Sequence, residues 1–387
     1  MKKFLVIFLV LSIVYSQKPN TFQTLMLNNL LSNSEKNVCI SPLSIYQIVS
    51  LLSNGATGKT KNEILKALIP DSAITKKTQL ELNLNNQKIL RYYNSNNEKV
   101  KMANAILAKH PLLESFAKIA QKYNTYNGLL KSVEQVNNWV NEKTNGKIKT
   151  ILDQNKNLAN VEMILLNAIY FKSKWKYEFN KKDTVKKEFK NSNKVIVNVD
   201  TMYKEFETIK YYEDEKIQMV ELPYEDENLS MILLLPSEKY TSVKEYINKE
   251  KEDYTKLYNK LKEIKDVKLY LPKFEVEFSS SLVDSFKKMG MKLAFSDNAN
   301  LDQLFSNPNL NKGLYVEDIL HKTYVKVDEE GTEAAGSTAV IISTKSMKKY
   351  IYFNVNRSFI YMIRDKRIKD TKGNDMMLFL GVINELK

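Results

Sequence analysis

The stretch EEGTEAAGSTAVIISTKSMKK, residues 329–349, places the strongest constraint on how this chain can fold. Between Glu333 and Lys345 it has eleven residues without a charge or a proline, and these end in TAVIIST. Small residues followed by β-branched ones form strands readily, and such a segment promotes aggregation when it stays exposed. Acidic residues precede the segment and lysines follow it. The chain therefore holds a latent strand between charged flanks, and its fold must accommodate that strand.

The first sixteen residues, MKKFLVIFLVLSIVYS, have the pattern of a secretory signal peptide. Two lysines precede an apolar run that is short for a membrane span, and Val14 and Ser16 provide small residues at the usual cleavage positions. A membrane anchor is the alternative, but the chain has no other long apolar run. We expect residues 1–16 to be removed and a secreted, extracellular chain of 371 residues, 17–387, to remain.

Cysteine and charge content restrict both the stabilisation of this chain and its partners. Cys39 is the only cysteine, so no intrachain disulfide forms and burial must stabilise the fold. The net charge of +14 becomes +12 when Lys2 and Lys3 are removed, which favours sulfated polysaccharide, acidic protein surfaces or nucleic acid as partners. The lysines are interleaved with acids, however, as in residues 248–268, which is typical of a solvated helical face. We expect a monomer that binds neither nucleic acid nor membrane, and we leave a sulfated polysaccharide open.

Helical patterns in the first third and strand patterns after residue 160 indicate a mixed α+β domain. Residues 41–56 begin with Ser41 and Pro42, a cap and a first-turn residue, and continue with apolar residues at helical spacing. Among the later strand segments, MILLLP is a continuous apolar run, which indicates a strand buried on both faces. No repeat and no Pro/Gly/Ser linker divides the chain. We therefore expect one domain; two domains with a break near residue 155 are the alternative.

No motif in the sequence supports catalysis or metal binding. SNGATGKT, residues 53–60, approaches a phosphate-binding loop, but Ser53 replaces its first glycine and a helical pattern precedes it, so a turn between two helices explains it better. His110 precedes Pro111 in an expected loop, whereas His321 lies in a strand pattern, where we expect a hydrogen-bonded core histidine. A Ser/His/Asp triad needs only one histidine, so a hydrolase remains an alternative without specific support. We expect no enzyme activity, no cofactor and no metal.

Seven segments, in order along the chain, resemble motifs of the serpin family of suicide peptidase inhibitors. They are NVCISPLSIYQIVSLLSNGATGKTKNEI, VNNWVNEKTNGKIKTIL, LLNAIYFKSKWKYEF, LYLPKFEVEF, HKTYVKVDEEGTEAAGSTA, FNVNRSFIYMI and LFLGVI. The resemblance covers nearly all of the chain after residue 16. Its departures are local: Ser173 stands where glycine is usual, Ser358 where proline is common, and the expected proline after the last strand is absent. These departures bear on local turns and leave the fold unaffected.

The resemblance implies a serpin-like single domain of the α+β class with three β-sheets, eight or nine helices and an exposed reactive loop at about 329–349. In this family a peptidase cleaves the loop, which then inserts into the central sheet. The hinge that starts insertion corresponds to Glu330, Gly331, Thr332, Glu333, Ala334, Ala335 and Gly336. Cleavage is expected fourteen residues after Gly331, between Lys345 and Ser346, which would place Lys345 in the specificity pocket of a trypsin-like enzyme. The alternative is that Lys345 only keeps an exposed loop soluble.

Insertion requires that alternate residues of the loop face a hydrophobic core. These residues are Thr332, Ala334, Gly336, Thr338, Val340 and Ile342, and none of them is charged. A charge buried there would cost several kcal/mol, and a proline would remove a ladder hydrogen bond. We therefore expect a secreted suicide inhibitor of trypsin-like serine peptidases that traps the acyl-enzyme, with a non-inhibitory carrier or chaperone on the same fold as the alternative. We also expect Thr332 to be exposed until insertion begins.

The resemblance further assigns polar residues to the region where the sheet opens. The family's polar cluster beneath the sheet, the shutter, corresponds to Ser41, Ser44, Asn167 and His321. The region where insertion begins or passes, the breach, corresponds to Trp175 and Lys322. Asn228, in Asn-Leu-Ser, is the expected glycosylation site, whereas Asn356, in Asn-Arg-Ser, lies in a strand motif and is expected to stay unmodified.

Overall fold

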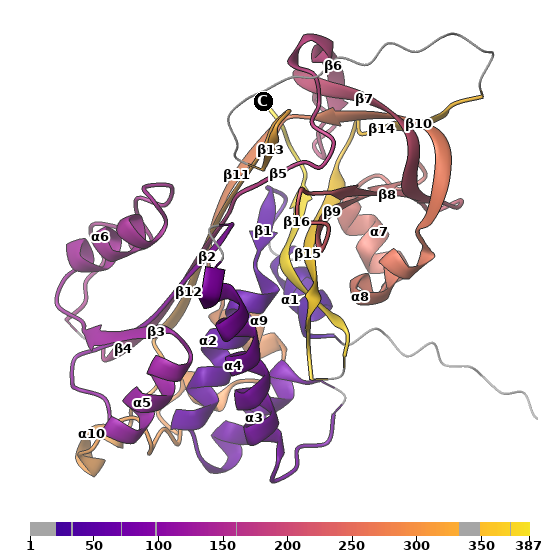
Figure 1. The fold of residues 1–387 in the computed structure, drawn as a ribbon. Helices are drawn as coiled ribbons and strands as arrows, with labels where there is room; N and C mark the ends of the chain where they lie inside the picture. The colour runs from indigo at the N-terminus through magenta and orange to yellow at the C-terminus, as the bar shows by residue number, and fades with distance from the viewer. Residues whose placement is uncertain are drawn as a thin grey trace, which may run out of the picture.

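Two large β-sheets make up most of the described part of the chain, with many of the helices gathered at one end and others on the flanks of the sheets (Figure 1). This computed structural model describes residues 21–31, 34–70, 72–96, 99–159, 161–332, 349–371 and 373–387. The expected signal peptide, residues 1–16, lies outside these ranges. Within them, no helix combines the length and the apolar character needed to cross a membrane.

The central sheet has seven strands among the described residues, in the order β3-β2-β4-β12-β13-β5, with β11 paired to β12. They are β2 (Val100–Ala108), β3 (Thr125–Leu129), β4 (Met163–Phe171), β5 (Ser173–Lys174), β11 (Phe274–Ser281), β12 (Asp318–Val327) and β13 (Gly331–Thr332). Strands β4 and β12 are parallel neighbours. Every residue of β4 is buried, as expected for a strand that is covered on both faces.

The second sheet has nine strands in the described ranges, in the order β1-β16-β15-β9-β8-β7-β10-β14, with β6 paired to β7. They are β1 (Val38–Ile40), β6 (Val185–Lys190), β7 (Ile196–Glu213), β8 (Ile217–Pro223), β9 (Leu229–Pro236), β10 (Lys262–Pro272), β14 (Ile351–Asn354), β15 (Phe359–Lys369) and β16 (Asp375–Ile383). Two of the three sheets expected from the sequence lie here. They are continuous because β7 is 18 residues long and pairs with β6 near its start, with β8 near its end and with β10 between. The mixed α+β class is confirmed, with the second and third expected sheets hydrogen-bonded into one.

Ten α-helical segments occur in the described residues, against the eight or nine expected, because two single turns of four residues, α8 and α10, are included. They are α1 (Phe22–Leu31), α2 (Pro42–Gly55), α3 (Gly58–Leu68), α4 (Thr78–Asn96), α5 (Glu114–Lys122), α6 (Val133–Lys143), α7 (Val243–Glu250), α8 (Tyr254–Leu257), α9 (Val283–Lys288) and α10 (Pro308–Asn311). Segment 53–60 spans the end of α2 and the start of α3, so the prediction of a turn between helices is confirmed.

The two faces of the central sheet pack against different hydrophobic clusters. The larger cluster contains residues from Phe22 to Ile383, on both sides of residue 155, so a division into two independent cores near that residue is wrong for the described chain. The smaller cluster lies under α6, where Val136 and Val140 pack against alternate residues of β2 and β4. Figure 1 shows α6 standing alone against this face. Helix α6 therefore covers the side of the sheet that the main core leaves open.

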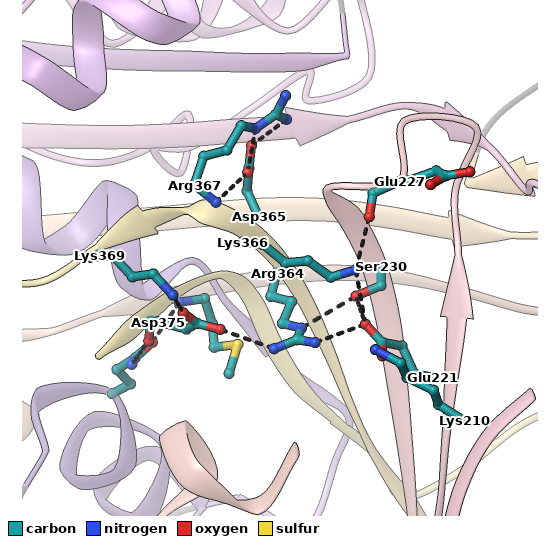
Figure 2. Close-up of polar contacts among 12 residues, drawn as sticks. Lys210, Glu221, Glu227, Ser230, Arg364, Asp365, Lys366, Arg367, Lys369 and Asp375 are labelled. Atoms are coloured by element: carbon teal, nitrogen blue, oxygen red, sulfur yellow. Dashed lines mark hydrogen bonds and ion pairs between the residues drawn. The ribbon is translucent and has the colours of Figure 1, made fainter. Parts of the chain in front are cut away.

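A buried ionic network lies across β8, β9, β15 and β16 of the second sheet (Figure 2). The guanidinium of Arg364 donates to Glu221 at 2.8 Å and to Asp375 at 3.0 Å, and the three side chains are at most 7% exposed. The ring of Tyr258 covers the guanidinium, with its centroid 4.1 Å away, and Ser230 Oγ donates to Glu221 at 2.7 Å. Partly exposed lysines pair with the same two carboxylates from outside: Lys210, Lys366 and Lys369. Each of the two carboxylates that bind the buried arginine is thus also paired with at least one lysine.

Burial by itself raises the pKa of Glu221, but the charge and hydrogen bond of Arg364 outweigh burial, so the pKa falls from 4.5 to about 2. Because the folded-state pKa lies below the unfolded value, the carboxylate stabilises the fold above pH 4.5. That contribution is lost as the pH falls from about 4.5 to 2.

Glu221→Gln is expected to lower the free energy of unfolding at pH 7 by about 2–3 kcal/mol, because Arg364 loses a charged partner in a buried site. The variant should then lose less stability than the wild type between about pH 4.5 and 2. Urea unfolding followed by tryptophan fluorescence over this pH range measures both effects. The same change at the exposed Glu263 on β10 is the control and should alter neither. Equal acid sensitivity of Glu221→Gln and wild type would contradict the assignment.

Candidate functional site

The parallel pairing of β4 with β12 is the feature of the central sheet on which the candidate site is built. Residues 164–170 of β4 pair with residues 318–324 of β12 without interruption, and we call this pairing the seam. Beyond it, β12 pairs with the short strand β13, which pairs in turn with β5. Figure 1 shows β13 and β5 together at one end of the central sheet. A strand entering the sheet between β4 and β12 must separate the seam, starting from this end.

Five polar side chains form a hydrogen-bonded cluster on the core side of the seam: Ser41, Ser44, Asn104, Asn167 and His321. Asn167 on β4 lies opposite His321 on β12 and opposite Asn104 on β2, so three strands contribute one row of side chains. The amide of Asn167 donates to Asn104 Oδ1 and to Ser44 Oγ. Ser41 caps α2, its Oγ accepting the N–H of Ser44 at 3.3 Å, and the N–H of Ser41 donates to His321 Nε2 at 3.1 Å. The cluster therefore ties the seam to the start of α2.

His321 is held in one protonation state by its two partners. Because Ser41 N–H needs Nε2 as its acceptor, the ring proton is on Nδ1 and is donated to Asn167 Oδ1. Burial lowers the pKa of His321 from 6.5 to about 3, so the ring is neutral at neutral pH. Both ring nitrogens are thus occupied, by a backbone amide and a side-chain amide. The expectation of a hydrogen-bonded core histidine is confirmed, and this geometry does not form the base of a hydrolase triad.

All four residues assigned to the shutter from the sequence lie in this cluster, whereas its fifth member, Asn104, was not expected from the sequence. Asn104 is an amide in an otherwise apolar run, MANAILA, on β2. A single buried amide inside a strand pattern needs a hydrogen-bonding partner, and that signal could have marked Asn104. Its partner could not have been named, because the register of β2 against β4 is a long-range property of the sheet.

The two residues assigned to the breach lie apart: Lys322 is part of β12, and Trp175 directly follows β5. The indole of Trp175 stacks on Tyr224, with ring centroids 4.6 Å apart and planes within 7°, and its Nε1 donates to the carbonyl of Asp328 at 3.0 Å. Lys322 is adjacent to His321 in β12. Its ammonium donates to the carbonyl of Thr150, in the segment after α6, and pairs with Glu277 of β11 at 2.7 Å. Trp175 thus holds the end of the seam, whereas Lys322 ties the segment after α6 to the sheet.

The chain reverses direction between β12 and β13 in a turn whose two glutamates are buried. Glu329 pairs with Lys273 at 3.0 Å and accepts the hydroxyl of Thr184 at 2.8 Å. Burial raises the pKa of Glu329, but these partners outweigh burial and the net shift is downward. Glu330 pairs with Lys181, and its carbonyl accepts the N–H of Trp175 at 3.0 Å. Glu330, which the sequence placed in the mobile hinge, is therefore ion-paired in this state of the protein.

Gly331 and Thr332 form β13 and are packed into the sheet. Gly331 lies so close to β5 that an added Cβ would be 2.2 Å from the carbonyl oxygen of Ser173, so the close approach requires glycine. The Thr332 side chain is fully buried, and its hydroxyl is 2.8 Å from that of Tyr224. The expectation that Thr332 is exposed before insertion is therefore wrong. Tyr224 provides the reason, because the tyrosine follows β8 and brings a buried hydroxyl to this point of the central sheet.

The rest of the expected loop lies outside the described residues: Glu333, Ala334, Ala335, Gly336, Lys345 and Ser346. Its two ends are fixed on different sheets. β13 ends at Thr332 in the central sheet, and β14, which begins at Ile351, pairs in parallel with β10 at the edge of the second sheet. Segment 333–348 therefore connects two anchored strands.

The other predicted residues lie apart from the seam. Asn228 is exposed in the turn between β8 and β9, where Asp226 Oδ1 accepts its backbone N–H at 3.1 Å. His110 is partly exposed near Glu162. In the described part of the chain, no group of three or more histidine, cysteine, aspartate or glutamate side chains could hold a metal ion.

Comparison with known families and structures identifies the class of protein that this fold and seam define. The family model described as Serpin (serine protease inhibitor) matches residues 17–386. The chain belongs to the serpin family, whose members are generally protease inhibitors.

Two curated relatives and two solved structures illustrate the similarity. Iripin-4 of Ixodes ricinus is 32% identical over 380 residues, which cover 95% of this chain and 93% of the relative. Serpin B3 of Homo sapiens is 30% identical, with 87% and 91% covered. The native-state structure of tengpin, a thermophilic serpin, aligns with a TM-score of 0.82 at 28% identity and covers 95% of this chain and 93% of its own. Thyroxine-binding globulin in complex with thyroxine, at 24% identity and a TM-score of 0.80 with 94% and 97% covered, shares the fold.

Neutral His321 makes the stability of the seam dependent on pH. Its folded-state pKa of about 3 lies below the unfolded value of 6.5, so below pH 6.5 only the unfolded chain binds the proton and stability falls. We expect wild type to lose about 2 kcal/mol of unfolding free energy from this residue between pH 7.5 and pH 5. His321→Gln should lack this loss, although it should be less stable at pH 7.5. Urea unfolding at both pH values tests this, with His110→Gln as the exposed control; a wild-type-like pH dependence in His321→Gln would refute it.

The hydroxyl pair of Thr332 and Tyr224 is expected to hold β13 in the sheet. Thr332→Val leaves the buried Tyr224 hydroxyl without a partner and should cost about 1–3 kcal/mol of unfolding free energy. Adding Tyr224→Phe to Thr332→Val removes the unpaired group. The double variant should therefore be less destabilised than the sum of the single variants by about 1 kcal/mol or more. A double-mutant cycle measured by urea unfolding decides this, and strictly additive effects would show that the two hydroxyls do not interact.

Proposed function

We propose that this serpin is a secreted suicide inhibitor of trypsin-like serine peptidases, which traps the acyl-enzyme by inserting its cleaved loop into the central sheet. The observation that supports this most directly is the seam. Strands β4 and β12 are parallel neighbours, and the segment that begins at the end of the seam continues into residues that suit a buried strand. An antiparallel partner for both strands is thus connected to the sheet before any cleavage, because β13 already runs antiparallel to β12.

The composition of segment 333–348 makes insertion favourable. Ala334, Gly336, Thr338, Val340 and Ile342 would face the core in an inserted strand, and none is charged. Roughly a dozen new ladder hydrogen bonds at about 1 kcal/mol each add to the gain. Burial of Val340 and Ile342 contributes about 1.5–3 kcal/mol apiece. Together these terms are large enough to displace a peptidase that remains attached to the cleaved end.

Lys345 sets the proposed specificity. Cleavage between Lys345 and Ser346 places an ammonium group in the primary pocket of the peptidase, where the acid of a trypsin-like enzyme pairs with it. Lys348 and Lys349 follow the bond and favour approach to an acidic enzyme surface. Secretion, by way of residues 1–16, and glycosylation at the exposed Asn228 belong to the same proposal.

Incubation with trypsin tests the proposal and separates it from its alternatives. We expect a covalent adduct that survives SDS, formed at near-equimolar stoichiometry, and Lys345→Ala should abolish it without lowering the melting temperature. A non-inhibitory carrier would be cut without forming an adduct, and a hydrolase would turn over substrate. Cleaved wild type should melt at a markedly higher temperature than the intact protein. The absence of an adduct with a broad panel of trypsin-like enzymes would refute the proposal.

Two neighbouring substitutions separate trapping from recognition. Ala334→Arg would bury a charge during insertion, whereas Ala335→Arg places the same charge on the opposite face of the inserted strand. Ala334→Arg should become a substrate, still cut after Lys345, while Ala335→Arg should still form the adduct. Thr332 is unsuited to this test, because Thr332→Arg would bury a charge in the intact protein as well. Equal trapping by both arginine variants would contradict insertion in this register.

A further inference from the structure

A cavity of about 290 Å³ lies where three segments meet, apart from the seam and the turn that leads into the loop. They are the turn 190–194 between β6 and β7, the segment 236–243 from the end of β9 to the start of α7, and residues 356–358 between β14 and β15. Three lining residues are cationic: Lys190, Lys194 and Arg357. The one lining carboxylate belongs to Glu238, whose side chain is 80% exposed. The cavity therefore carries an excess of positive charge.

Arg357 is the fixed element of this cavity. The carbonyl of Pro236 accepts from Nε at 3.1 Å and from Nη2 at 2.8 Å, and Asn356 Oδ1 accepts from Nη1 at 2.9 Å. These bonds use three of the five N–H groups of the guanidinium and leave one each on Nη1 and Nη2. Glu238 forms an ion pair with Nη1 at 3.6 Å, a distance too long for a hydrogen bond. The arginine thus presents two remaining donors from a side chain that is only 21% exposed.

The two lysines come from a turn that is fixed by backbone hydrogen bonds. Asn191 N–H donates to the carbonyl of Val195 at 2.9 Å, and Lys194 N–H donates to that of Asn191 at 2.8 Å. The N–H of Lys190 donates to the carbonyl of Asn356 at 2.8 Å, which joins this turn to the segment that carries Arg357. Neither lysine side chain forms an ion pair within the described residues. Both ammonium groups are therefore available to a ligand.

We propose that this cavity binds the phosphate or sulfate group of a small ester, such as a sugar phosphate or a sulfated monosaccharide. The two remaining N–H groups of Arg357 match two oxygens of a tetrahedral oxyanion, as guanidinium groups commonly do. Lys190 and Lys194 add positive charge, which balances the second charge of a phosphate ester and strengthens the attraction of a singly charged sulfate ester. Hydroxyl and amide groups of Ser192, Ser237 and Asn356 line the same space and suit a polyol. Sites for drug-sized ligands measure about 300–1,000 Å³, so this cavity is limited to a ligand of about one sugar unit.

Ligand binding should stabilise the folded chain, because a ligand that binds only the native state raises the melting temperature. This effect does not depend on peptidase inhibition, so failure of one proposal leaves the other standing. A rise in melting temperature that saturates distinguishes binding in the cavity from diffuse attraction of anions to a basic protein. Such attraction weakens with ionic strength and does not saturate at one site.

The experiment titrates the chain of residues 17–387 with glucose 6-phosphate, glucosamine 6-sulfate, inorganic phosphate and inorganic sulfate at constant ionic strength. Isothermal titration calorimetry and thermal unfolding are the readouts. We expect saturable binding of at least one ester with a stoichiometry of one and a higher melting temperature. Stronger binding of the phosphate series or of the sulfate series identifies the oxyanion. The absence of saturable binding of all four probes at millimolar concentration would overturn the proposal, as would binding of the inorganic ions with no binding of either ester.

Two charge-matched double variants locate the site. Lys190→Ala/Lys194→Ala should weaken ester binding at least tenfold, whereas Lys262→Ala/Lys265→Ala, which removes two exposed lysines of β10, should leave the affinity within about twofold. Arg357→Lys keeps the charge, loses the paired donors and should also weaken binding at least tenfold; its melting temperature without ligand controls for folding. Equal losses in the two double variants would show non-specific attraction and refute the site. An unchanged affinity in Lys190→Ala/Lys194→Ala would refute it as well.

Discussion

The pairing of β4 with β12 is the interaction on which the rest of this structure depends. The two strands are parallel and far apart in sequence, so no hairpin holds them together. Their register relies on backbone hydrogen bonds, on packing against both faces and on the Asn167–His321 pair. Hydrogen bonds of this kind can be exchanged for bonds to another strand at little net cost, whereas a purely apolar contact would only be lost. A polar row inside a buried sheet therefore makes the seam specific in register and yet separable.

The far end of the seam combines close packing with buried charge. Trp175 stacks on Tyr224, and Gly331 lies against β5 with no room for a side chain. Two glutamates with lysine partners flank this packing. Buried ion pairs are costly to break from one side, because the remaining charge is left without compensation. The turn before the loop is therefore held in place by packing and by charge together.

Local patterns in the sequence predicted local features of the fold well. Ser41 and Pro42 marked the start of α2, and a histidine within a strand pattern was correctly expected to be buried and hydrogen-bonded. Features that depend on distant strands were missed. The union of two expected sheets follows from the length of β7 and from its three partners, and neither is visible as a local pattern. The burial of Thr332 depends on Tyr224, which is 108 residues away, and the place of Asn104 depends on the register of β2. The proposed reactive bond lies where the structure describes no residues, so it rests on sequence alone.

Because segment 333–348 is anchored on two different sheets, each copy of the molecule can respond to a peptidase only once under the proposed mechanism. While the segment is intact, it closes a ring with the body of the protein, because the strands at its two ends, β13 and β14, are each hydrogen-bonded into a sheet. Hydrolysis of one peptide bond opens that ring, and under the proposed mechanism no step restores it. Each copy then reacts with a single peptidase molecule and cannot react again. The number of copies present, and not the turnover of any one of them, would set how much proteolysis such a protein can stop.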